Sequence, residues 1–251
     1  MIEVTNITKK YGSFFALDDI TLDIASNKVT AIVGENGSGK STLLNIMGRL
    51  NNATSGSVLL DSKDINTYAS LEYACKIATL KQANTINLRL RVIDLVGFGR
   101  YPHNQGRLNA DDILIVEESL AFMQCLDLRD KFIDQLSGGQ LQRVYIAMIL
   151  AQDTDVMLLD EPLNNLDLKH AHELMELIRQ LVDEHGKTVV IIMHDLNMVY
   201  RYVDNIIALK HGRLICDGAV DDVLNEHMLH EIYDMHFEIQ KCETHTVAFI
   251  K

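Results

Sequence analysis

The feature that most constrains the fold of this chain is a Gly-rich segment, residues 34–42, that lies between two apolar stretches. The stretch before it, Val29 to Val33, is almost continuously apolar, which is typical of a strand buried on both faces. The stretch after it carries apolar residues at helical spacing: Leu43, Leu44, Met47 and Leu50. A strand, a Gly-rich loop and a helix in direct succession predict an α/β fold.

Apolar strand-like segments return in the second half of the chain. They are expected at 156–159, 188–193 and 206–209, separated by helical stretches such as 169–184. Two short segments near the start, 2–4 and 20–24, alternate apolar and polar residues with period two and also predict strands. Because buried strands alternate with helices, we expect a mostly parallel sheet that is covered on both faces.

The middle of the chain, from about residue 85 to residue 135, favours helix instead. Asn109 is expected to cap a helix there, with Asp111 and Asp112 in its first turn. The predicted apolar stripe of this helix comprises Ile113, Val116, Leu120 and Met123. We therefore predict a single domain, residues 1–251, in which a helical subdomain (85–135) is inserted between residues 1–84 and 136–251.

Composition narrows the classes of function. Apolar residues make up 47% of the chain. The net charge is −12, and this acidic balance argues against a nucleic-acid partner because Lys and Arg are the residues that bind phosphate backbones. No stretch approaches the roughly 18 consecutive apolar residues of a membrane-spanning helix, and the opening lacks the apolar core of a secretory signal. We expect a cytoplasmic protein whose four cysteines, Cys75, Cys125, Cys216 and Cys242, are reduced core thiols.

The Gly-rich segment fits the pattern GxxxxGK[ST], which is a phosphate-binding loop. Glycines let backbone N–H groups approach phosphate oxygens, and the start of the following helix adds partial positive charge. Lys40 is expected to reach the β- and γ-phosphates, and the Ser41 hydroxyl to take one position around Mg²⁺. The full predicted cradle is Gly34, Glu35, Asn36, Gly37, Ser38, Gly39, Lys40, Ser41 and Thr42. The loop alone leaves kinases, GTPases, helicases and transport ATPases open.

Two further motifs separate these classes. Leu136 to Gln140 (LSGGQ) resembles the signature of ATP-binding-cassette (ABC) ATPases, and Val156 to Pro162 (VMLLDEP) is similar to their Walker B strand with its catalytic glutamate. The order of the motifs along the chain also matches that family. The resemblance implies a P-loop ABC ATPase domain with a mostly parallel sheet core, an N-terminal antiparallel β subdomain and an inserted helical subdomain. It also implies that the chain hydrolyses ATP with Mg²⁺.

The resemblance assigns roles to residues that lie outside the loop. Glu161 would polarise the attacking water, His194 would contact the γ-phosphate, and Gln82 would contact Mg²⁺ and sense a membrane partner. Asp160 would complete the Mg²⁺ site beside Ser41 and Gln82.

Members of this family work as head-to-tail dimers, so a homodimer with two ATP sites is implied. Tyr11 would stack on adenine, and Asp167 would bridge the two sites. The signature of one copy would face the ATP of the other through Ser137, Gly138, Gly139 and Gln140.

Three positions, in two segments, depart from the usual family pattern. Asn164 and Asn165 stand where the D-loop usually reads Ser-Ala, which leaves the hydrogen bonding between the two sites open. Met148 stands where many members carry arginine, so a salt bridge behind the signature is not expected.

Within the ABC family the chain resembles the importers of iron(III) siderophores, haem and cobalamin. The segments that carry this resemblance are 98–103 (FGRYPH), 195–197 and 208–213. Two further segments, 80–84 (LKQAN) and 160–170 (DEPLNNLDLKH), are especially similar to catechol-siderophore and petrobactin-type iron importers of Gram-positive bacteria. They imply a peripheral subunit on the cytoplasmic side of the membrane, with permease subunits and, indirectly, a siderophore-binding lipoprotein as partners. Export, import of haem, cobalamin or a metal ion, and a non-transport role in repair or translation stay open as alternatives. No residue of such a subunit selects the cargo.

The segment from Leu88 to Arg107 mixes apolar and basic residues, among them Phe98, Arg100 and Tyr101. This character would suit a groove that receives a helix of the permease. Charge reversal at Arg100 is then expected to uncouple transport from ATP binding.

Overall fold

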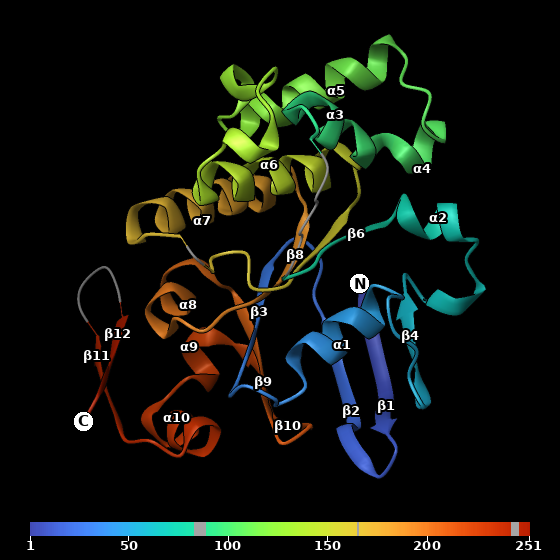
Figure 1. The fold of residues 1–251 in the computed structure, drawn as a ribbon. Helices are drawn as coiled ribbons and strands as arrows, with labels where there is room; N and C mark the ends of the chain where they lie inside the picture. The colour runs from blue at the N-terminus through green and yellow to red at the C-terminus, as the bar shows by residue number, and fades with distance from the viewer. Residues whose placement is uncertain (83–88, 165, 242–245) are drawn as a thin grey trace. The chain divides into compact units, whose positions relative to one another are not determined.

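The computed structural model describes residues 1–82, 89–164, 166–241 and 246–251 (Figure 1). They form two compact units, one of residues 1–67 and 188–251, the other of residues 68–187. Ala83, Asn84, Leu88, Asn165 and Cys242, which the sequence analysis names, lie outside the described residues.

The first unit contains a sheet with parallel strands at its centre. Its strand order is β10-β9-β3-β8, where β3 (Val29–Val33) runs parallel to both β8 (Thr188–Ile192) and β9 (Asn205–Lys210). The edge strand β10 (Arg213–Ala219) is antiparallel to β9. Every residue of β3 and β8 is buried, so the prediction of strands covered on both faces is confirmed here.

The same unit holds an antiparallel sheet near the N terminus. It has the order β2-β1-β4-β5 and comprises β1 (Ile2–Tyr11), β2 (Phe14–Ile24), β4 (Ser55–Leu60) and β5 (Lys63–Asp64). The strands β1 and β2 are longer than the predicted segments. The register between them shifts between Val4 and Ile7, where Asn6 has a φ of 49°, and such a bulge interrupts the alternation of apolar and polar residues.

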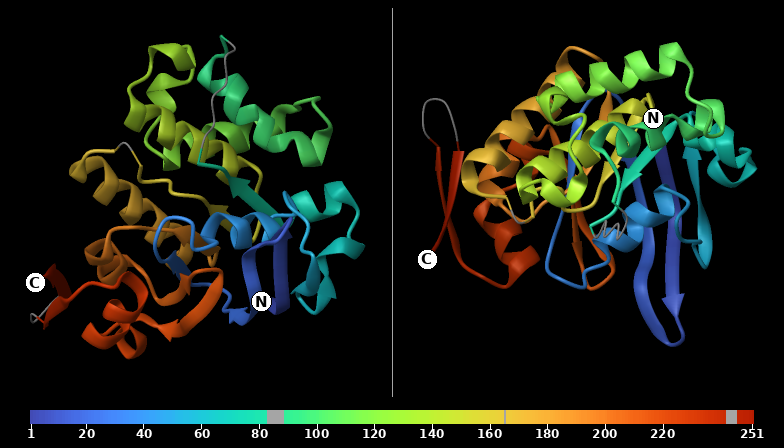
Figure 2. Two further views of the ribbon diagram at one scale, coloured as in Figure 1. Left: turned by 60° about the horizontal axis from the view of Figure 1, so that its bottom comes forward. Right: turned by 45° about the horizontal axis from the view of Figure 1, so that its top comes forward.

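The helices of the first unit follow its strands. They are α1 (Lys40–Met47), the turn η1 (Ile65–Thr67), α8 (Leu196–Tyr202), α9 (Val220–Val223) and α10 (Glu226–Tyr233). The helix α1 ends at Met47, before the predicted Leu50, because Gly48 caps it and Arg49 turns into the left-handed region with a φ of 55°. A hairpin of β11 (Phe237–Lys241) and β12 (Thr246–Ile250) closes the unit (Figure 2).

The second unit combines two parallel strands, β6 (Ile77–Leu80) and β7 (Val156–Leu159), with helices. The helices are α2 (Ser70–Ala74), α3 (Val92–Gly97), α4 (Tyr101–Asn104), α5 (Ala110–Phe122), α6 (Gly138–Ala151) and α7 (Leu168–Asp183), joined by the turns η2 (Phe98–Arg100), η3 (Leu126–Leu128) and η4 (Ile133–Gln135). The strand β7 has the predicted bounds, and α7 lies one residue before its predicted position.

The predicted cap of helix α5 and most of its predicted apolar stripe are confirmed. Asn109 is its N-cap, and the Asn109 side chain accepts a hydrogen bond from the N–H of Asp112 at 2.9 Å. Val116, Leu120 and Met123 are buried. The placement of Ile113 in the apolar stripe is wrong, because Ile113 is 41% exposed and Asp112 takes the inward position of the first turn.

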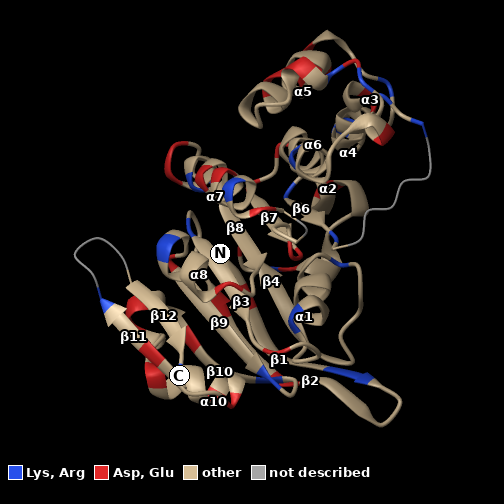
Figure 3. Cartoon of the chain, turned by 60° about the vertical axis from the view of Figure 1, so that its left-hand side comes forward, with Lys and Arg blue, Asp and Glu red and all other residues tan. Residues whose placement is uncertain are grey.

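Acidic residues occur along α5 and α7, which Figure 3 marks in red. In this part of the chain no helix has both the length and the apolar character that crossing a membrane requires. Cys125 is buried as predicted, whereas Cys75 and Cys216 are half-buried, so the prediction of core thiols is wrong for these two. Burial raises the pKa of Cys125 and of Cys216 to about 11.

Candidate nucleotide-binding and hydrolysis site

The Gly-rich loop follows β3 directly, and its shape depends on glycine at two positions. A Cβ on Gly34, whose φ is 139°, would lie 2.1 Å from the carbonyl oxygen of Leu209. A Cβ on Gly39, whose φ is 105°, would lie 2.6 Å from the carbonyl oxygen of Ala16. Because neither position has room for a side chain, the loop backbone packs closely against neighbouring strands and then opens α1.

The chemistry of this loop fits a bound polyphosphate. Lys40 is only 5% exposed, and its ammonium donates hydrogen bonds to the carbonyl oxygens of Gly34 at 2.9 Å and Glu35 at 2.8 Å. The buried Ser38 hydroxyl has no hydrogen-bond partner among the described residues. A Cβ on Gly37 would meet open space. A buried cation and an unsatisfied hydroxyl in a loop that opens a helix are suited to an anion.

The predicted residue His194 lies at the same edge of the parallel sheet in the first unit as the Gly-rich loop. Ile32 of β3 pairs with Ile192 of β8, and these strands are parallel. Gly34 and His194 each stand two positions beyond that pair, so both emerge at the carboxyl ends of neighbouring strands. Ligands of α/β sheets bind at such ends.

Tyr11 lies at the end of β1 and is 53% exposed, so much of its ring is accessible for stacking. Its hydroxyl oxygen accepts a hydrogen bond from the Asn51 side-chain amide at 2.5 Å, and the Lys9 ammonium lies 4.9 Å from the ring centroid. Sequence reasoning missed Asn51, because only the fold brings the segment that follows α1 to Tyr11.

The second unit brings together Gln82 and Glu161. Leu80 of β6 pairs with Leu159 of β7, and Gln82 and Glu161 each stand two positions further along these parallel strands. The Gln82 amide Nε2 donates to Glu161 Oε2 at 2.6 Å. Asp160 is 5% exposed, and its backbone N–H donates to the carbonyl oxygen of Leu80 at 2.9 Å. A buried and a half-buried carboxylate thus stand side by side at the end of β7.

The signature segment begins the helix α6 with a capping box. The Ser137 hydroxyl accepts a hydrogen bond from the N–H of Gln140 at 3.3 Å, and the Gln140 side chain accepts one from the N–H of Ser137 at 3.1 Å. Ser137, Gly138 and Gln140 are exposed. A Cβ on Gly139 would lie 3.5 Å from the His170 ring.

Asp167 caps the helix α7. Its carboxylate accepts hydrogen bonds from the backbone N–H of His170 at 2.9 Å and lies 2.8 Å from Nδ1 of the His170 ring. These hydrogen bonds lower the pKa of Asp167. The His170 side chain is 44% exposed, and its ring lies beside both the cap of α7 and the signature glycine Gly139.

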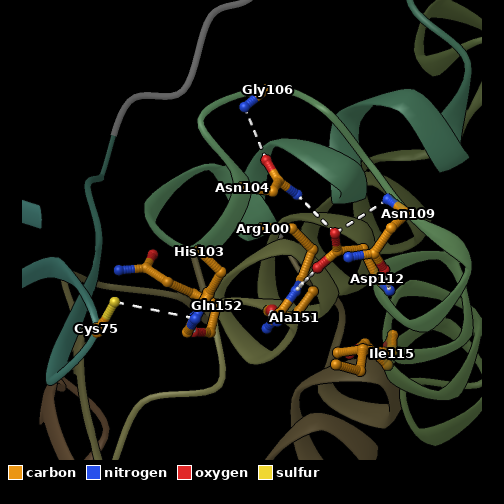
Figure 4. Close-up of polar contacts among 11 residues, drawn as sticks. Cys75, Arg100, His103, Asn104, Gly106, Asn109, Asp112, Ile115, Ala151 and Gln152 are labelled. Atoms are coloured by element: carbon orange, nitrogen blue, oxygen red, sulfur yellow. Dashed lines mark hydrogen bonds and ion pairs between the residues drawn. The ribbon is translucent and has the colours of Figure 1, made fainter.

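The structure contradicts the assignment of Arg100 to an exposed groove (Figure 4). The Arg100 side chain is 7% exposed, its Nε lies 3.0 Å from Asp112 Oδ1, and its Nη1 donates to the carbonyl oxygen of Ala151 at 2.9 Å. The neighbouring Phe98 and Tyr101 are 54% and 55% exposed. A charge reversal at Arg100 would leave two buried acidic groups together, so it would disturb the fold rather than test a surface.

A phosphate loop at the start of a helix, together with paired acidic residues after a buried strand, defines a P-loop nucleoside triphosphatase. Residues 17–164 match the ABC transporter family, and the chain belongs to it. It binds and hydrolyses ATP.

Two curated relatives match nearly end to end. The chain is 47% identical to the petrobactin import ATP-binding protein YclP of Bacillus subtilis (strain 168), over 99% of this chain and 98% of that protein. It is 39% identical to the ferric enterobactin transport ATP-binding protein FepC of Escherichia coli (strain K12), over 91% of this chain and 85% of that protein.

Solved structures share the fold. A dimeric structure of the bacterial ABC transporter cassette MJ0796 matches with a TM-score of 0.78 and 34% identity, covering 88% of this chain and 99% of that one. The inward-facing structure of a putative metal-chelate type ABC transporter matches with a TM-score of 0.86 and 23% identity, covering 100% and 96%.

Proposed function

We propose that this chain is the ATP-hydrolysing subunit of an importer for iron(III)–siderophore complexes. The observation that carries this proposal is the similarity, over nearly the whole chain, to a subunit named for petrobactin import. Petrobactin and enterobactin are both siderophores, and the second named relative supports the same class of cargo.

The site supports a division of roles among the residues. Lys40 and the loop backbone bind the phosphates, and Tyr11 stacks on adenine. Glu161 accepts the proton of the attacking water, and His194 holds the γ-phosphate. Ser41, Gln82 and Asp160 are the residues that would hold Mg²⁺, which supplies positive charge beside the phosphate oxygens when bound.

The proposal includes two copies of the chain and a membrane permease. Asp167 and the exposed signature residues Ser137, Gly138 and Gln140 suit a face that meets a second copy, as the dimeric relative supports. ATP would close the pair, and hydrolysis would reopen it. The exposed Phe98 and Tyr101 suit contact with the permease on the cytoplasmic side of the membrane. A siderophore-binding lipoprotein would deliver the cargo to that permease.

Radiolabelled iron uptake tests this function. Cells that lack the gene, grown with too little iron, receive the wild-type chain or Glu161→Gln on a plasmid. We expect the wild type alone to restore uptake of iron(III)–petrobactin. Parallel assays with haem, cobalamin and a hydroxamate siderophore define the cargo. Restoration of cobalamin or haem uptake without siderophore uptake would contradict the proposed cargo.

A further inference from the structure

Two side-chain amides converge on one oxygen of Glu161. Gln82 Nε2 donates to Glu161 Oε2 at 2.6 Å, and Asn164 Nδ2 donates to the same oxygen. The donors come from two segments, since Gln82 follows β6 and Asn164 lies in the turn between β7 and α7. Donors that approach from two directions restrict the rotation of the carboxylate group.

The backbone explains why Asn164 reaches Glu161. The N–H of Asn164 donates to the carbonyl oxygen of Glu161 at 3.2 Å, which closes a four-residue turn. Pro162 takes the second position of this turn, where a proline ring suits the backbone. Glu161 itself has a φ of 51°, a left-handed conformation that is costly for a residue with a side chain.

The side-chain bond of Asn164 therefore comes in addition to the bond that closes the turn. Asn164 is exposed, so its side chain could rotate freely in solvent. Holding it in one rotamer through the bond to Glu161 therefore costs conformational entropy. Hydrogen bonds from an amide to a carboxylate are strengthened by the charge, which offsets this cost. The bond acts on the orientation of Glu161 rather than on the path of the backbone.

We propose that Asn164 is a positioning residue for ATP hydrolysis: with Gln82, it holds the Glu161 carboxylate in the orientation that meets the attacking water. This inference rests on the proposed role of Glu161 as the proton acceptor. Asn164 acts through Glu161 and is not assigned a contact with ATP.

The test compares substitutions that remove or keep the amide donor. Asn164→Ala removes it, and Asn164→Asp removes it at nearly constant shape. We expect kcat to fall about tenfold in both variants, as for the loss of one charge-assisted hydrogen bond, while KM changes less than about twofold. Asn164→Gln keeps an amide donor and is expected to recover part of kcat. Asn66→Ala, at an exposed asparagine of η1, is the matched control and should behave as the wild type.

Two readouts besides turnover separate positioning from a structural role. The melting temperature of the nucleotide-free Asn164→Ala chain and its affinity for a fluorescent ATP analogue should both equal those of the wild type. In a chain that already carries Glu161→Gln, Asn164→Ala should not lower turnover further, because both changes act through one group.

The outcomes are distinct. Wild-type kcat in Asn164→Ala, a parallel loss of kcat, affinity and melting temperature, or a further loss of turnover beside Glu161→Gln would each overturn the positioning role. If Glu161→Gln is inactive while Asn164→Ala is normal, only this inference fails. If Glu161→Gln hydrolyses ATP at the wild-type rate, the proposed role of Glu161 fails as well.

Discussion

Among the single residues of the site, Lys40 shows most directly how the fold prepares an anion site. The residue is buried, and its ammonium donates hydrogen bonds to the carbonyl oxygens of Gly34 and Glu35. Burying a cation costs hydration free energy, and a phosphate beside the ammonium would offset part of that cost.

The change Lys40→Met should therefore weaken nucleotide binding. Removing one charged hydrogen-bond donor costs about 1.5–3 kcal/mol, so the Kd for ATP should rise on the order of tenfold to a hundredfold. Titration with a fluorescent ATP analogue measures this. Lys63→Met, at an exposed lysine of β5, is the control. An unchanged Kd in Lys40→Met would show that the loop does not hold the phosphates as described.

At the scale of elements, η2, α4 and α5 are joined by the pair of Arg100 and Asp112. Asn104 Nδ2 donates to Asp112 Oδ2 at 3.0 Å, and the N–H of Asn109 donates to the same oxygen at 3.1 Å, so both carboxylate oxygens are used. The pair is therefore enclosed by hydrogen bonds, as Figure 4 shows.

Breaking this pair from one side should be costly. Arg100→Met leaves the Asp112 carboxylate buried without its cation, which typically costs about 3–5 kcal/mol of unfolding free energy. The double change Arg100→Met with Asp112→Leu removes both charges and should recover much of that loss. Urea denaturation followed by circular dichroism measures both. Equal destabilisation by the single and the double change would contradict the account.

The same pair predicts how stability depends on pH. Burial alone would raise the pKa of Asp112, but hydrogen bonds from Asn109, Asn104 and Arg100 outweigh burial and lower it below its ordinary value. A lowered pKa adds stability above the pKa of the unfolded chain, near 4, and this stability is lost as pH falls through the folded pKa. Denaturation midpoints between pH 6 and pH 3 should fall more steeply in the wild type than in the double variant. Equal slopes would contradict this.

The strands show which parts of the fold the sequence could predict. The strands β3, β7 and β8 are buried along their whole length, so their sequences are almost continuously apolar. β3 and β7 have the predicted bounds, and β8 ends one residue before the predicted end at residue 193. The full lengths of β1 and β2 could not be predicted, because the alternation of apolar and polar residues stops where a bulge shifts the register.

The site was predictable only as separate motifs. Gln82 and Glu161 are 79 positions apart, and their contact depends on the register of β6 and β7. The burial of Arg100 depends on a partner in another helix, which no local pattern indicates. The side-chain bond from Asn164 to Glu161 could not be anticipated, since it requires the four-residue turn that begins at Glu161.

For the whole molecule, we expect association with a permease through Phe98 and Tyr101, the exposed aromatic residues named above in the second unit. Phe98→Asp combined with Tyr101→Asp should abolish co-purification with the permease and iron uptake, while ATP affinity stays unchanged. Phe249→Asp, at an exposed aromatic residue of β12, is the control and should retain association. Normal association of the double variant would place the contact elsewhere.

Glu161 is the proposed proton acceptor of an ATPase in which two copies of the chain act together. The most direct test measures ATP turnover and molecular mass together for the wild type and Glu161→Gln. Loss of a general base lowers turnover about a hundredfold or more. For Glu161→Gln we expect this loss of turnover with unchanged ATP affinity and with a stable dimer that forms only when ATP is present. Near-normal turnover, or a variant that stays monomeric with ATP bound, would contradict it.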